Sequence, residues 1–192
     1  MEAFLVSTGV VALAEIGDKT QLLALLLAAR FRKPVPIILG IFVATLANHA
    51  MAGAVGAWVA ALVGPTAMRW ILGLSFIAMA AWMLVPDKLD ADGPEQGAPP
   101  RLGVFSATFV AFFLLEMGDK TQIATIALAA KYSSLAAVVM GTTLGMMIAN
   151  VPAVLLGEVA ARKLPMRLVH GIAGATFLVL GLLLLAGVRV PG

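Results

Sequence analysis

Two nearly identical acidic heptapeptides are the residues of this sequence that could do chemistry. Residues 15–21 read Glu-Ile-Gly-Asp-Lys-Thr-Gln, and residues 116–122 read Glu-Met-Gly-Asp-Lys-Thr-Gln. Both copies lie inside long apolar runs, where a charged side chain costs at least about 2.5–3.5 kcal/mol on membrane-insertion scales. Carboxylate oxygens are ligands that hard cations prefer. The repeated acids therefore indicate a cation site rather than an isolated helical ion pair.

Within each copy the Glu and the Asp stand three residues apart. On a continuous helix their side chains would lie about 60° apart, on one face. The glycine between them, Gly17 or Gly118, weakens a helix and permits local unwinding, which would free carbonyl oxygens as further ligands. We predict four metal-ligating carboxylates: Glu15, Asp18, Glu116 and Asp119.

Further polar side chains could support the ion or couple it to protons. The threonines and glutamines of the motifs could ligate the ion, hold the carboxylates or bond between helices. Two asparagines at corresponding positions could add oxygen ligands or bond between helices, and His49 could relay protons or simply pack. The candidates for supporting or proton-coupling roles are Lys19, Thr20, Gln21, Asn48, Lys120, Thr121, Gln122 and Asn150.

The charges of the two motifs favour a particular exchange. Four carboxylates carry −4, and Lys19 and Lys120 return +2, which leaves −2. One divalent cation would neutralise this charge, and so would two protons. Either cargo relieves the cost of burying net charge, so the count favours exchange of a divalent cation against protons.

Composition predicts the elements that must position these residues. The chain is 61% hydrophobic and 12% charged, with a mean hydropathy of +1.03. Most of its apolar runs exceed the roughly 20 residues that span a bilayer. We predict an all-α integral membrane protein with six transmembrane helices, at about 4–29, 36–63, 67–85, 103–130, 135–160 and 166–187. Cysteine is absent, which excludes disulfides and thiolate ligands.

The chain divides into two similar halves. Residues 1–85 form a first three-helix repeat, residues 86–101 a polar linker rich in Pro and Gly, and residues 102–192 a second repeat. A shift of 101 residues carries Glu15 onto Glu116. Because each half has three spans, the second must enter the membrane from the opposite side, as in the inverted repeats of many secondary transporters.

Loop charges predict the orientation. Eight basic residues fall on the side of the linker, and three fall on the other side. Positive loops stay cytoplasmic, so the linker should be cytoplasmic and both termini outside. Since the basic residues lie in short loops, the net charge of +3 reflects membrane orientation rather than nucleic-acid binding.

The sequence Glu-x-Gly-Asp-Lys-Thr, present twice in a six-span chain of this length, resembles a known family over essentially the whole chain. It is similar to the bacterial manganese exporters of MneA type, which are related to the Golgi manganese and calcium transporters of the GDT-one family. The resemblance implies export of Mn²⁺ or Ca²⁺ in exchange for protons, with the motif acids lining the site. On this interpretation the partners are the metal ion, protons and the lipid of a bacterial inner membrane, with no bound cofactor and no enzymatic activity.

Other functions could also use these residues. A calcium/proton exchanger or a passive divalent cation channel would also use buried acids. An intramembrane aspartyl protease is a further alternative, because Asp18 and Asp119 could share a proton as a catalytic dyad. The extra Glu and Lys beside each Asp serve a cation better than such a dyad. A membrane scaffold would explain the apolar surface but not the repeated charges.

Overall fold

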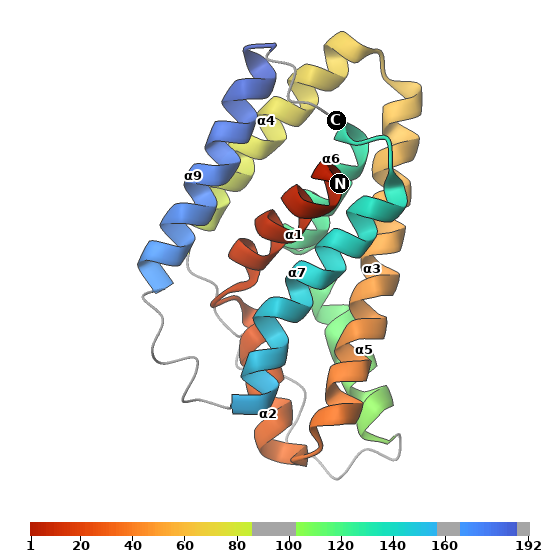
Figure 1. The fold of residues 1–192 in the computed structure, drawn as a ribbon, viewed down its shortest axis with the longest axis vertical. Coiled ribbons are helices and arrows are strands. Elements are labelled where there is room, and N and C mark those ends of the chain that lie inside the picture. Colours follow the sequence, from red (N-terminus) through yellow and green to blue (C-terminus); the bar gives the residue numbers. More distant parts are fainter. Residues whose placement is uncertain (86–102, 157–165, 188–192) are drawn as a thin grey trace.

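A computed structural model describes residues 1–85, 103–156 and 166–187, and every regular element within these residues is a helix (Figure 1). The all-α prediction is therefore confirmed for this part of the chain. The predicted linker, 86–101, lies outside the described residues. The helices are α1 (Glu2–Glu15), α2 (Lys19–Phe31), α3 (Pro34–Leu62), α4 (Pro65–Met83), α5 (Val104–Glu116), α6 (Lys120–Lys131), α7 (Leu135–Leu156) and α9 (Met166–Leu185).

Among the described residues, four helices are long and apolar enough to cross a membrane: α3, α4, α7 and residues 168–185 of α9. Two of them, α3 and α4, begin with Pro34 and Pro65, residues that suit the first helical turn because it lacks an internal acceptor for their nitrogen. Large apolar side chains such as Leu5 and Trp58 are exposed on the outside of the molecule. Such a surface suits lipid rather than water.

The predicted spans 4–29 and 103–130 are each interrupted rather than continuous helices, and each interruption contains the glycine at which the sequence permits local unwinding. The first is divided into α1 and α2 by residues 16–18, and the second into α5 and α6 by residues 117–119. Gly17 has φ of 84° and Gly118 has φ of 80°, a region that residues with a Cβ rarely adopt. The glycines thus unwind the helix, so that the Glu of each motif ends one helix and the Asp is the last residue before the next.

Each broken helix packs mainly against the long middle helix of the other half. Helices α1 and α2 lie against α7, whereas α5 and α6 lie against α3. In Figure 1, α3 runs from the lower end of the molecule to the upper end, and α7 runs back down. The last helices of the two halves, α4 and α9, pack against each other beside α1 and α6.

Two glycines make the same close contact in the two halves. A Cβ on Gly40 of α3 would lie 2.8 Å from the Cβ of Thr108 on α5. A Cβ on Gly141 of α7 would lie 3.0 Å from the Cβ of Ser7 on α1. The shift of 101 residues converts one pair into the other. Close approach of the helices at both places therefore depends on glycine.

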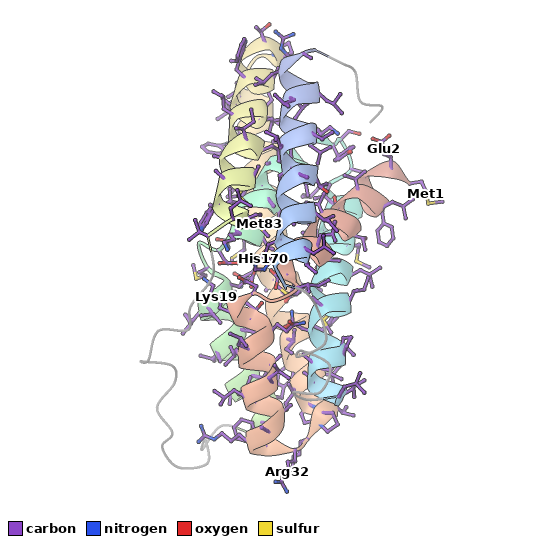
Figure 2. All side chains as sticks on the ribbon, turned by 90° about the vertical axis from the view of Figure 1, so that its left-hand side faces the viewer. Met1, Glu2, Lys19, Arg32, Met83 and His170 are labelled. Carbon is purple, nitrogen blue, oxygen red and sulfur yellow. The ribbon has the colours of Figure 1, made fainter. Side chains whose placement is uncertain are left out.

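The breaks lie midway along the molecule, between two apolar clusters. One cluster gathers α1, α4, α6 and α9 around Phe76 and Phe177, and the other gathers α2, α3, α5 and α7 around Ile41 and Phe112. Figure 2 places Lys19, at the start of α2, near the middle of the long axis. Polar groups at the breaks are thus enclosed by apolar layers on both sides.

Candidate metal centre

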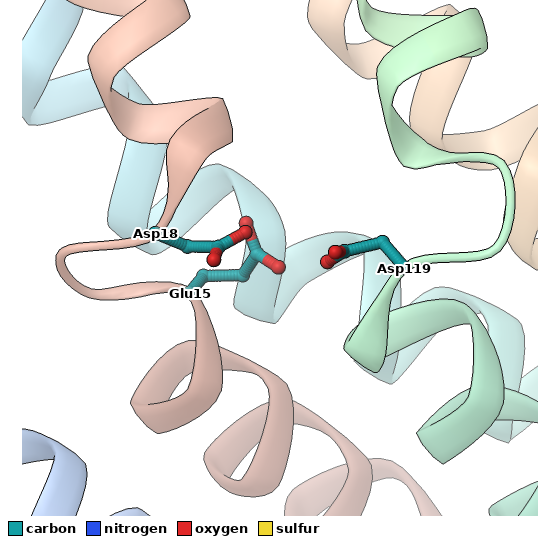
Figure 3. A group of neighbouring side chains, drawn as sticks. All are labelled: Glu15, Asp18 and Asp119. Carbon is teal, nitrogen blue, oxygen red and sulfur yellow. The ribbon is translucent and has the colours of Figure 1, made fainter. Parts of the chain in front are cut away.

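Three of the predicted ligands come together at the two breaks. Glu15 is the last residue of α1, and Asp18 and Asp119 are the last residues of the first and second breaks; their side chains point toward one another (Figure 3). One carboxylate oxygen from each of the three lies within 4.8 Å of the others. All three side chains are buried, at 0%, 1% and 2% exposure respectively. Residues about a hundred positions apart in sequence thus form one oxygen cluster of the kind that hard cations bind.

The fourth predicted ligand, Glu116, lies beside this three-carboxylate cluster. Its side chain is also buried, and it interacts electrostatically with Glu15 and Asp119. Its Oε1 lies 3.9 Å from Nε2 of His49 on α3. Glu116 is therefore a neighbour of Glu15 and Asp119, and it also has a histidine beside it.

The motif threonines orient the glutamates in the same way in both copies. Thr20 donates a hydrogen bond of 2.6 Å from its Oγ1 to Oε2 of Glu15. Thr121 donates the equivalent bond to Oε1 of Glu116. Both threonines are buried. Each hydroxyl thus holds one carboxylate oxygen of the glutamate in its own motif.

The motif glutamines close the breaks. The backbone N–H of Gly17 donates to Oε1 of Gln21 at 3.0 Å, and the N–H of Gly118 donates to Oε1 of Gln122 at 2.7 Å. Gln21 also donates from Nε2 to the carbonyl oxygen of Ala149 on α7. These bonds satisfy amides that the interrupted helix leaves without an intrahelical acceptor.

The two asparagines are fully buried on the long middle helices. Asn48 of α3 donates from Nδ2 to the carbonyl oxygen of Phe113 at 3.0 Å. Asn150 of α7 donates from Nδ2 to the carbonyl oxygen of Met146 at 3.1 Å. In both side chains the amide nitrogen is engaged, and the oxygen accepts no hydrogen bond from the described residues.

Several buried side-chain oxygens near the breaks accept no hydrogen bond from the described residues. Leaving a buried acceptor without a partner costs roughly 1–3 kcal/mol, so such atoms in a native protein call for an explanation. A cation supplies one, because it binds oxygen lone pairs directly. Among the described residues, the side-chain oxygens without a hydrogen-bond donor include Oε1 of Glu15, Oδ1 of Asn48, Oε2 of Glu116, Oδ2 of Asp119 and Oδ1 of Asn150.

The two motif lysines differ in their surroundings. The Nζ of Lys19 lies 2.7 Å from Oδ1 of Asp119, and its side chain is 24% exposed. Lys120 is 2% exposed, and its Nζ donates to the carbonyl oxygen of Val85 after α4 at 3.5 Å. One lysine therefore lies directly on a candidate ligand of the opposite half.

The two histidines near the breaks are the residues of this region that the sequence indicates most weakly. His49 follows Asn48 in an apolar run, which suggested a relay or a packing group; its ring is buried, but neither nitrogen has a hydrogen-bond partner among the described residues. His170 of α9 lies with Nε2 3.2 Å from the carbonyl oxygen of Ile16, inside the first break. No sequence spacing pointed to that contact.

The sequence is similar to those of known proteins over most of its length. A "Putative manganese exporter" of Vibrio cholerae is 52% identical over 183 residues, which cover 95% of this chain and 90% of that protein. "GDT1-like protein 4" of Oryza sativa is 30% identical over 92% of this chain and 70% of its own length. No solved structure matches the chain. The family described as "Divalent cation/proton antiporter GDT1" matches residues 3–91 and 104–190. The chain therefore belongs to the GDT1 family of divalent cation/proton antiporters.

Proposed function

We propose that this protein exports Mn²⁺, or Ca²⁺, in exchange for protons by alternating access. The family is one of cation transporters rather than enzymes, which removes the protease alternative. The observation that carries the proposal is the meeting of Glu15, Asp18 and Asp119 at two helix breaks. Buried carboxylates of this kind are costly, and they mark ion pathways in membranes.

Charge balance supports the coupling to protons. In an apolar surrounding, several adjacent carboxylates repel one another unless a cation or protons neutralise them. Binding of a divalent ion to the three-carboxylate cluster would expel protons, and loss of the ion would allow protons to return. The ion and the protons would then share the same oxygens and bind in turn.

An inverted repeat of six spans would make alternating access possible. We count each broken helix as one span, so that each half contributes three. The opposite directions of α3 and α7 and the equivalent contacts of Gly40 and Gly141 support this arrangement. So do the two segments matched by the family, one in each half. Rocking of the halves about the central site would expose it to either side.

The proposal also names the transported ion and the orientation of the protein in the membrane. The name of the Vibrio relative favours Mn²⁺, whereas oxygen ligands alone suit Ca²⁺ equally well. Basic loops favour a cytoplasmic segment at 86–101, with both termini outside the bacterial inner membrane. A calcium/proton exchanger and a passive channel are the competing functions.

Flux through reconstituted vesicles tests the proposal. An acidic lumen should accelerate Mn²⁺ uptake in wild-type proteoliposomes and should release protons as Mn²⁺ enters. Asp18→Asn and Asp119→Asn remove charge at nearly constant shape and should abolish this uptake. Glu2→Gln, an acid-to-amide change at the start of α1, is the matched control and should retain it. Undiminished flux in both aspartate variants would remove these acids from the mechanism.

The same vesicles separate the competing functions. Mn²⁺ uptake that is indifferent to the pH gradient would indicate a passive channel. Uptake driven by the gradient, but with Ca²⁺ displacing Mn²⁺ when both are present, would indicate a calcium/proton exchanger. Inhibition of Mn²⁺ uptake by excess Mg²⁺ would show how far the site discriminates among hard dications.

A further inference from the structure

His49 on α3 is a buried side chain that the proposed cycle does not use. Its ring has no exposed surface, and neither Nδ1 nor Nε2 has a hydrogen-bond partner among the described residues. A buried imidazole normally finds such a partner, because an unmet polar group in an apolar surrounding is costly. The absence of a hydrogen bond on both nitrogens is therefore a feature to be explained.

The neighbour of this ring is a candidate ligand. Nε2 of His49 lies 3.9 Å from Oε1 of Glu116, too far for a hydrogen bond. Metal–ligand bonds to nitrogen and oxygen are roughly 2.0–2.6 Å long, so two atoms at this separation can both reach one ion between them. A neutral imidazole offers one lone pair for this purpose.

We propose that His49 supplies a nitrogen ligand to the transported ion, together with Glu116, and thereby selects transition-metal dications over Ca²⁺ and Mg²⁺. This inference rests on the proposed function and names the determinant of its selectivity. Glu116 stands three residues before Asp119 at the second break, where the N–H of Asp119 donates to the carbonyl oxygen of Glu116 at 3.2 Å, so an ion held by Glu116 would lie beside the three-carboxylate cluster.

The chemistry of the ligands explains the selectivity. Ca²⁺ and Mg²⁺ are hard ions that bind almost entirely to oxygen and gain little from imidazole. First-row transition metals accept imidazole nitrogen, with affinity rising from Mn²⁺ to Fe²⁺ and Co²⁺. The carboxylates would hold any of these ions, and His49 would favour the transition metals. Fe²⁺ and Co²⁺ should accordingly compete with Mn²⁺ better than Ca²⁺ does.

Pulsed electron paramagnetic resonance of bound Mn²⁺ tests the ligand directly. The sequence has two histidines, so protein purified with a tag free of histidine restricts the imidazole signal to His49 and His170. We expect ¹⁴N modulation of the Mn²⁺ signal in the wild type, its loss in His49→Gln, and its retention in His170→Gln. A wild-type spectrum without ¹⁴N modulation overturns the proposal, and this measurement requires no variant to fold.

Flux ratios test the selectivity. Loss of a group that only supports a metal ligand already weakens metal binding by about 10–100-fold, so at low Mn²⁺ concentration loss of the direct ligand in His49→Gln should lower Mn²⁺ uptake by roughly tenfold or more. Ca²⁺ uptake under the same pH gradient should remain, and the control variant Glu2→Gln should change the uptake of neither ion. Equal losses for both ions in a folded His49→Gln protein would overturn the proposal. Wild-type vesicles that move no dication would refute the proposed function instead, and the ¹⁴N spectrum would still decide whether His49 is a ligand.

Discussion

Lys19 and Asp119 form an ion pair of 2.7 Å that joins the first copy of the motif to the second. The lysine begins α2, the aspartate precedes α6, and the pair bridges the two halves beside the three-carboxylate cluster. A positive charge on a candidate ligand repels an arriving cation, and it also stabilises the carboxylate when no metal is bound. Lys19 and the metal ion therefore compete for the carboxylate of Asp119.

Removing that lysine charge should strengthen metal binding. We expect Lys19→Gln to raise the apparent affinity for Mn²⁺ by roughly tenfold, the effect of about 1.4 kcal/mol of lost repulsion. Calorimetric titration of the purified protein measures this affinity. Lys33→Gln, at an exposed lysine before α3, should leave it unchanged. Weaker binding in Lys19→Gln would mean that the lysine holds Asp119 in place rather than competing for it.

The second break should be sensitive to a single methyl group. Gly118 has φ of 80°, and a Cβ added there would meet no atom within 4 Å, so Gly118→Ala is opposed by backbone strain alone. That strain costs about 1–2 kcal/mol, and both melting temperature and Mn²⁺ flux should fall. Gly9→Ala, inside α1 and equally open, should be neutral or stabilising because alanine favours a helix. Equal thermal unfolding of the two variants in detergent would contradict the importance of the positive φ.

The two close helix contacts should respond alike to added volume. A Cβ at Gly40 would approach the carbonyl oxygen of Phe105 to 2.9 Å, and one at Gly141 would approach that of Phe4 to 2.5 Å. Gly40→Ala and Gly141→Ala should each destabilise the protein by about 1–3 kcal/mol through overpacking. Gly171→Ala on α9 meets open space and is the matched control. A large loss in one of the two and none in the other would argue against equivalent contacts.

The chain's single tyrosine reports on the contact between α1 and α6. Tyr132 donates from its hydroxyl to Oε1 of Glu2 at 3.2 Å and accepts a bond from Lys131 at 2.9 Å. Burial, followed by the Glu2 charge and hydrogen bond, raises the pKa of Tyr132 from 10.0 to about 12. Ultraviolet titration should therefore find phenolate forming near pH 12 in folded protein. Glu2→Gln should lower this midpoint, and a wild-type midpoint near 10 would contradict the buried contact.

The raised pKa of Tyr132 also determines how the free energy of unfolding should change with pH. Between pH 10 and 12 the unfolded chain would lose the phenolic proton while the folded chain keeps it, so the free energy of unfolding should fall as the pH rises. Below pH 10 both states are protonated and the contribution is fully present. Tyr132→Phe should flatten this part of the stability curve. A variant that loses stability as steeply as the wild type would assign the loss to other groups.

The repeated motif allowed much of the site to be predicted, because the same acids recur at the same depth in two halves. The meeting of Glu15 and Asp18 with Asp119 follows from that repetition. For Gly17 the sequence could show only that unwinding is allowed. Glycine adopts helical and positive-φ conformations about equally well, so its presence does not say which of the two occurs. The hydrogen bond from the N–H of Gly17 to the side chain of Gln21 forms only when the helix is broken, so the sequence alone could not predict it.

Contacts that depend on how the helices pack against one another could not be predicted from the sequence. The 3.9 Å between His49 and Glu116 depends on how α3 lies against α5 and α6. The contact of His170 with Ile16 likewise depends on where α9 begins relative to the first break. Helix ends were easier: Pro34 and Pro65 mark the starts of α3 and α4 within two residues of the predicted spans.

Because α1 and α2 pack on α7 of the second half, and α5 and α6 pack on α3 of the first, we expect that neither half folds by itself. A polypeptide severed between residues 85 and 103 would give two fragments, each presenting a surface that only the other fragment covers. Such fragments should accumulate when they are synthesised together and be degraded when made singly. The same reciprocity would let two identical half-length chains assemble as a dimer, from which gene duplication and fusion would yield a protein of this form.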